Sequence, residues 1–180
     1  MNEQMSTVEY WNTIYTGRST AQPGGHETDR FAPVLANLEG PRVIDVAAGY
    51  ADLCKRIRRE RSDLTVVAAD FADEAMHRSG FKPYVLTDAT AMPFPDRAFD
   101  TVICTQAMGY MADPPAFLRE ARRVGWWLLL TVSDGEPAAG VRWAWTPDTL
   151  HALLEPFGEL EFLSALPDLA MLVAKLRFTA

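Results

Sequence analysis

The sequence predicts a single-domain α/β fold, with a doubly wound, mostly parallel seven-stranded sheet that ends in an antiparallel hairpin. Short aliphatic runs alternate with helical patterns through most of the chain, which is typical of a parallel sheet. Two apolar runs joined by Pro167-Asp168 then close the chain as a hairpin. The 180 residues, of which 48% are hydrophobic, are enough for one core, and no internal repeat is visible.

The first strand is expected at residues 43–46, a β-branched run that follows the turn signal Gly40-Pro41. A small-residue loop comes next, and Leu53 and Ile57 then share one face of a helix. Strand, tight loop and helix form the nucleotide-binding corner of a doubly wound sheet, where a ligand approaches the backbone closely.

The later elements follow the same two periodicities. Further strands are expected at residues 64–69, 84–86, 99–105, 126–132, 159–166 and 169–178. Helices are expected within residues 1–20, from 28 to 38, 73–79, 113–124 and 146–157. Residues 89–97 contain two prolines and are expected to form a loop. We expect residues 1–40 to cover the site and residues 41–180 to form the core of one domain.

Composition excludes several classes of function. The formal net charge of −7 argues against nucleic acid, and the basic residues between 55 and 61 are interpreted as a solvated helix face. Cys54 and Cys104 lack metal-binding spacing, which predicts no metal and a reduced, cytoplasmic protein. The N-terminus does not resemble a signal peptide, and no apolar run approaches the ~20 residues of a membrane span.

Three acidic residues stand at the carboxyl ends of the first three predicted strands: Asp45, Asp70 and Asp88. The carboxyl ends of parallel strands form the ligand crevice of an open sheet, so these side chains should meet there. Asp70 comes one β-α-β step after Asp45, where a carboxylate can accept hydrogen bonds from both hydroxyls of a ribose.

This set of motifs resembles the class I S-adenosylmethionine-dependent methyltransferases, most closely the small-molecule branch related to ubiquinone biosynthesis. Val-Ile-Asp-Val-Ala-Ala-Gly-Tyr-Ala stands in place of the glycine motif, and Ala-Ala-Asp-Phe-Ala-Asp-Glu-Ala-Met in place of the ribose-acid segment. Thr-Asp-Ala-Thr-Ala-Met-Pro-Phe-Pro-Asp matches the adenine loop, and Phe-Leu-Arg-Glu-Ala-Arg-Arg-Val the helix before the fifth strand. The resemblance implies a Rossmann-like fold and S-adenosyl-L-methionine as cofactor.

The resemblance also implies roles for individual residues. Asp45 and the loop with Ala47 and Gly49 would border the methionine part of the cofactor. Asp70 would hold the ribose. The remaining cofactor contacts would come from Phe71 and Met76 against the adenine, Asp88 and Ala89 at its amino edge, Thr105 after the fourth strand, and Tyr15 above.

The sequence departs from the family pattern at two glycines, where Ala47 and Ala51 stand instead. Because alanine tolerates positive φ poorly, we expect ordinary backbone angles at both positions. The glycine-rich turn that usually precedes the fifth strand is also missing, which should shorten a surface connection.

The acceptor is expected to be a small molecule, because residues 104–108 lack the Asn/Asp-Pro-Pro-Tyr pattern of enzymes that methylate nucleic-acid amino groups. Its wall is expected from Tyr10, Gln106, Met108, Tyr110, Trp143 and Trp145, which suit a flat or hydrophobic molecule. The two tryptophans could equally form a closed lid. No universal catalytic residue is expected, and His26 is the candidate general base.

Two other classes stay open at this stage. A nicotinamide-dependent oxidoreductase would explain Asp70, but not Asp88 with its proline loop, and no Tyr-x-x-x-Lys pair is present. A methyltransferase-like domain without activity, which binds or regulates a partner, would explain Ala47 and Ala51. The chain is expected to be a monomer or a homodimer.

Overall fold

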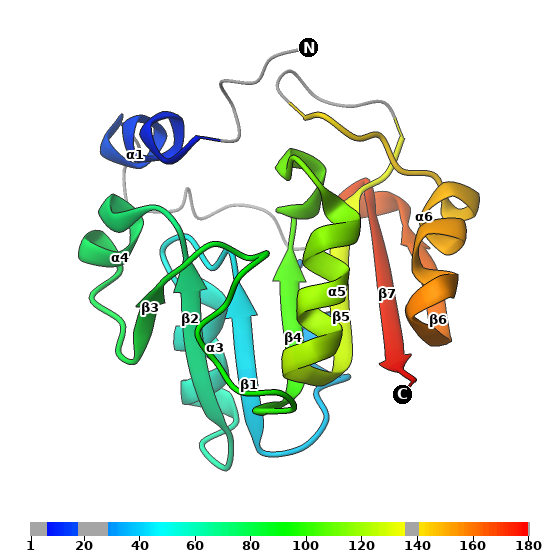
Figure 1. The fold of residues 1–180 in the computed structure, drawn as a ribbon, viewed down its shortest axis with the longest axis horizontal. Helices are drawn as coiled ribbons and strands as arrows, with labels where there is room; N and C mark the ends of the chain where they lie inside the picture. Colours follow the sequence, from blue (N-terminus) through cyan, green and yellow to red (C-terminus); the bar gives the residue numbers. More distant parts are fainter. Residues whose placement is uncertain (1–6, 18–28, 136–140, 180) are drawn as a thin grey trace.

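The computed structural model describes residues 7–17, 29–135 and 141–179, and it confirms the predicted fold class. One seven-stranded sheet has the order β3-β2-β1-β4-β5-β7-β6 (Figure 1). Strands β1 to β5 are parallel, and β7 runs antiparallel to both β5 and β6. His26 lies outside the described residues, so its predicted role as a base stays a prediction.

The strands agree with the predicted runs to within two residues at each end. They are β1 (Arg42–Val46), β2 (Thr65–Asp70), β3 (Tyr84–Leu86), β4 (Phe99–Thr105), β5 (Gly125–Ser133), β6 (Gly158–Leu166) and β7 (Met171–Phe178). Helix α5 passes into β5 at Gly125 with no intervening turn, where a side chain would collide with Val102.

The helices are α1 (Val8–Gly17), α2 (Ala32–Leu35), α3 (Asp52–Glu60), α4 (Asp73–Ser79), α5 (Pro114–Val124) and α6 (Pro147–Leu154). The prediction for residues 28–38 was wrong in extent, since α2 has four residues. Asp29 caps the turn before it by accepting a hydrogen bond from the amide of Phe31, and it also pairs with Arg56. This long-range ion pair holds Asp29 outside the helix.

The two faces of the sheet carry separate cores. Helices α5 and α6 cover one face and α3 lies on the other (Figure 1). Over β1 and β4 the first face is covered by the loop of residues 87–98, whose Met92 and Phe94 pack into the same core as α5. The connection from β3 to β4 is therefore a loop that covers this face of the sheet, where a parallel sheet usually has a crossover helix.

Cys54 and Cys104 are both buried free thiols. Within the described residues, no helix is long and apolar enough to cross a bilayer. The same part of the chain holds no cluster of three or more His, Cys, Asp or Glu arranged for a metal ion.

Candidate active site

A cavity of about 1220 Å³ lies along the carboxyl ends of the parallel strands. Ligand pockets usually enclose roughly 300–1,000 Å³, so this one has room for a cofactor and a second small molecule. The predicted residues that line it are Asp45, Ala47, Gly49, Asp70, Phe71, Asp88, Ala89, Thr105, Gln106, Tyr110 and Tyr15. The sheet thus brings the ends of β1, β2, β3 and β4 to one cavity.

Asp45 is the next-to-last residue of β1 and is 1% exposed. Its Oδ2 accepts a hydrogen bond from the Cys54 thiol at 3.4 Å, and its Oδ1 has no partner among the described residues. Burial raises the pKa of Asp45 to about 7, and the nearby Asp70 contributes to the increase. A buried carboxylate with one unpaired oxygen is suited to accept a hydrogen bond from a cationic ligand group.

Asp70 ends β2 and pins the loop after β1. Its Oδ2 accepts a hydrogen bond from the Gly49 amide at 2.8 Å, and its Oδ1 accepts one from the Ala72 amide at 3.0 Å. Burial raises the pKa of Asp70 although these amides oppose the shift. Tyr84 completes the arrangement by donating to the Gly49 carbonyl at 2.9 Å. The carboxylate therefore shapes the loop as well as facing the cavity.

The backbone angles expected at the two alanines were wrong. Ala47 has φ +57° and Ala51 has φ +56°, both in the left-handed region. Gly49 between them has φ +54°, and a side chain there would meet the Tyr15 hydroxyl at 2.9 Å. The hydrogen bonds that hold Gly49 therefore impose glycine-like geometry on alanines, and strained backbone of this kind persists where surrounding contacts hold it.

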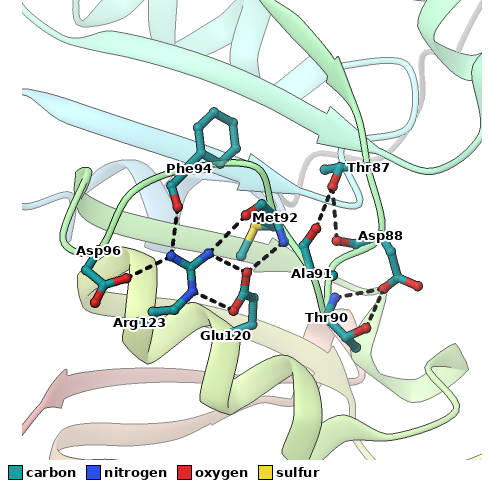
Figure 2. Close-up of polar contacts among 9 residues, drawn as sticks. All are labelled: Thr87, Asp88, Thr90, Ala91, Met92, Phe94, Asp96, Glu120 and Arg123. Atoms are coloured by element: carbon teal, nitrogen blue, oxygen red, sulfur yellow. Dashed lines mark hydrogen bonds and ion pairs between the residues drawn. The ribbon is translucent and has the colours of Figure 1, made fainter.

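Asp88 follows β3 in a turn that its own side chain stabilises. Its Oδ1 accepts hydrogen bonds from both the amide and the hydroxyl of Thr90 at 2.8 Å. The Thr87 hydroxyl bridges the carbonyls of Asp88 and Ala91 (Figure 2). This turn fixes the side chain of Asp88 at the edge of the cavity.

The opposite end of the cavity is lined by amide, hydroxyl and aromatic groups. Gln106 has φ +54°, and its side-chain oxygen accepts a hydrogen bond from the Ser133 hydroxyl at 2.9 Å. Tyr110 meets Trp11 of α1 edge to face, with ring centroids 5.2 Å apart. These groups offer hydrogen bonds and flat apolar surface to an acceptor.

Five predicted site residues do not line the cavity: Met76, Tyr10, Met108, Trp143 and Trp145. Met108 and Trp145 are corrected to core residues, since they are 0% and 6% exposed in the core beneath α5 and α6. Trp143 stacks on Trp145 and donates to the Met111 carbonyl, which agrees with the closed-lid alternative. Met76 is half-buried on α4, and Tyr10 packs on Trp11.

The contributors that sequence reasoning missed include Arg30, Trp11 and Tyr84. Arg30 and Trp11 line the cavity, and Arg30 is the only cation among the described lining residues. The spacing around Trp11 predicted an amphipathic helix, but this pattern does not show whether its apolar face packs in a core or lines a site. No local signal marks Tyr84, because it acts through a hydrogen bond to the distant Gly49.

The chain matches the family model described as a methyltransferase domain over residues 44–125. It is 33% identical over 104 residues to the ubiquinone/menaquinone biosynthesis C-methyltransferase UbiE of Paraburkholderia phytofirmans, covering 52% of this chain and 43% of that protein. Over residues 44–125 the chain is thus similar to class I S-adenosylmethionine-dependent methyltransferases. The likeness to the ubiquinone-biosynthesis branch is also confirmed, and the chain spans less than half the length of this relative.

Solved methyltransferase structures share the fold. A SAM-dependent methyltransferase from Aquifex aeolicus aligns with a TM-score of 0.67 at 17% identity, covering 78% of this chain and 84% of that one. A putative methyltransferase of Haloferax volcanii, in complex with the activator Trm112, aligns at 0.75 with 14% identity and 96% of both chains.

S-adenosylmethionine, the cofactor of this methyltransferase family, fits the residues of the cavity. Its ammonium group matches the unpaired Oδ1 of Asp45, and its carboxylate matches Arg30. The loop of residues 47–49 presents little side chain, so a ligand can approach its backbone.

Proposed function

We propose that this chain transfers a methyl group from S-adenosylmethionine to a small, flat and largely apolar acceptor in the cytoplasm. One observation carries the proposal: a single cavity joins the carboxylates of Asp45, Asp70 and Asp88 to the aromatic wall of Trp11 and Tyr110. The first part suits an adenosyl amino acid and the second suits an aromatic ring.

The bound cofactor supplies an activated methyl group on a sulfonium. Asp45 would accept a hydrogen bond from the ammonium group, and Arg30 would pair with the carboxylate. Asp88 would use its outer oxygen for the adenine amino group, since its other oxygen is held by Thr90. Asp70 would face the ribose while it holds the loop at Gly49.

The remaining lining residues would align the acceptor and exclude water. Trp11 and Tyr15 of α1 border the cavity, and Gln106 and Tyr110 form its far wall. Alignment at this end would let the reaction proceed mainly by proximity and orientation. The relatives named for ubiquinone and menaquinone biosynthesis support quinone-type rings as the first acceptors to test.

Calorimetric titration of S-adenosylmethionine and S-adenosylhomocysteine tests the binding step. Asp45→Asn is the informative variant, because it keeps the shape and removes a buried charge, and it should weaken both ligands by roughly tenfold or more. Asp63→Asn, with an exposed carboxylate, is the matched control. Nicotinamide cofactors should not bind.

Transfer of tritiated methyl to quinol acceptors tests the chemical step. Turnover that Asp45→Asn reduces would support the proposal. Binding of both adenosyl ligands without turnover on any acceptor would favour the alternative of an inactive binding domain. Absence of binding to the unsubstituted protein would contradict the proposed function altogether.

A further inference from the structure

The loop of residues 87–98 has one end in the cavity and the other end over the sheet. Thr87 to Thr90 line the cavity, whereas Met92 and Phe94 pack into the core beside α5. Pro93 and Pro95 have no amide hydrogen to donate, so the loop cannot form a regular pattern of backbone hydrogen bonds of its own. Its position therefore depends on contacts with the rest of the protein.

Arg123, near the end of α5, supplies most of these contacts (Figure 2). Its Nη2 donates to the Met92 carbonyl at 2.9 Å, and its Nη1 donates to the Phe94 carbonyl at 2.7 Å and to Asp96 Oδ1 at 2.9 Å. Its remaining two N–H groups donate to Glu120 at 2.8 Å and 2.6 Å. All five donors of the guanidinium are thus engaged, three of them on the loop.

Glu120 completes a clamp, which we define as the pair Glu120 and Arg123. Glu120 is one turn earlier on α5, and its Oε1 accepts a further hydrogen bond from the Met92 amide at 2.6 Å. Its side chain is 12% exposed. The Arg123 guanidinium keeps the pKa of Glu120 below its ordinary range, so both groups stay charged at neutral pH. Met92 is therefore held through both its amide and its carbonyl.

A short chain of contacts leads from the clamp to the cavity (Figure 2). Ala91, next to the clamped Met92, accepts a hydrogen bond from the Thr87 hydroxyl at 3.2 Å. Thr87 also contacts the Asp88 carbonyl, and Asp88 in turn holds Thr90. The clamp itself is absent from the described residues that line the cavity.

We propose that Glu120 and Arg123 are positioning residues that fix Asp88 and Ala89 against the adenine edge of the cofactor, without touching it. The assignment rests on the proposed function, because it needs an adenosyl ligand in the cavity. If the assignment is right, the preference of the site for adenine depends on two side chains that do not line the cavity.

The test compares two ligands that differ only at the base, S-adenosylhomocysteine and S-inosylhomocysteine. The Asp88 carboxylate can accept a hydrogen bond from the 6-amino group of adenine, whereas the 6-oxo group of hypoxanthine offers only another acceptor. The unsubstituted protein should therefore prefer the adenosyl ligand by about tenfold or more. Arg123→Gln should reduce that preference to within about twofold, because the loop loses the three hydrogen bonds that the guanidinium donates to Met92, Phe94 and Asp96.

Arg122→Gln is the matched control, since it removes the same charge from the neighbouring residue of α5, which makes no hydrogen bond or ion pair with the described residues of the loop. It should leave the preference unchanged. Glu120→Gln is nearly isosteric and should give an intermediate preference, and it carries the same test if Arg123→Gln does not fold. Arg123→Lys should restore part of the preference, because an ammonium keeps the charge but not the planar fork.

The outcomes separate this inference from the proposed function. If the unsubstituted protein binds neither ligand, the proposed function fails. If it binds them and Arg123→Gln and Glu120→Gln keep the full base preference, the clamp has only a structural role and the inference is wrong. An equal loss of affinity for both ligands, with the ratio unchanged, would overturn it in the same way.

Discussion

At the scale of single residues, the buried carboxylate of Asp45 couples stability to pH. Its pKa is about 7 in the folded protein, against an ordinary value of 3.8, and the main cause is burial. Between these two pH values the folded state binds a proton that the unfolded state has lost. The free energy of unfolding therefore falls as the pH rises through this window.

We predict that the unliganded protein loses up to about 4 kcal/mol of unfolding free energy between roughly pH 4 and pH 7 through this group. Asp45→Asn should remove that slope, as measured by urea unfolding at several pH values. S-adenosylhomocysteine should bind more tightly as the pH rises, because its ammonium group favours the ionised carboxylate. An unchanged slope in Asp45→Asn would show that other groups carry the effect.

At the scale of elements, the loop between β1 and α3 stores backbone strain. Ala47 and Ala51 hold left-handed angles that cost an L-residue about 1–2 kcal/mol each. The loop is held by hydrogen bonds from Gly49 to Asp70 and from Tyr84 to Gly49. These contacts come from β2 and β3, so the neighbouring strands determine the shape of the loop.

Replacing the two alanines by glycine should have unequal effects. Ala47→Gly relieves the strain at a half-buried position and should stabilise the protein by about 1 kcal/mol. Ala51 is 0% exposed and packs in the core, so Ala51→Gly loses a buried methyl group and should be close to neutral. Chemical unfolding of both variants checks this, and destabilisation by Ala47→Gly would contradict the assigned backbone angle.

At the scale of the whole molecule, α1 borders the cavity and connects distant elements. Asn12 donates to Asp73 and accepts a hydrogen bond from the Glu74 amide at 3.2 Å, which caps α4. The Tyr50 hydroxyl donates to the Tyr15 carbonyl at 2.9 Å. None of the residues of α1 is buried, so these polar contacts, with Trp11 against Tyr110, hold the helix in place.

Asn12→Ala should therefore release α1 more than it unfolds the protein. We expect a loss of about 1 kcal/mol in stability from the missing cap, together with roughly tenfold weaker binding of S-adenosylhomocysteine. Hydrogen exchange of residues 8–17 should become faster in the variant. Thr13→Ala is the control, because the Thr13 hydroxyl donates to the Glu9 carbonyl within α1 itself. Equal affinities in the two variants would argue against a covering role.

The sequence by itself determined the order of elements and the edge at which the site lies. Strand and helix periodicities predict seven strands, and the acids at the carboxyl ends of β1, β2 and β3 must converge because parallel strands end at one edge of a sheet. The loop character of residues 89–97 followed from Pro93 and Pro95, which remove backbone donors. The order of elements and the loop follow from patterns that are local in the chain, and the shared edge follows from the parallel sheet that this order implies.

Only the tertiary structure decided the features that depend on distant contacts. Ala47 and Ala51 adopt positive φ because Asp70 and Tyr84 hold the loop between them, against their own preference. Met108 and Trp145 read as possible site residues but are buried, since an apolar side chain suits a pocket wall and a core equally. The clamp joins α5 to a loop about thirty residues earlier, and no local pattern encodes which segments a folded sheet brings side by side.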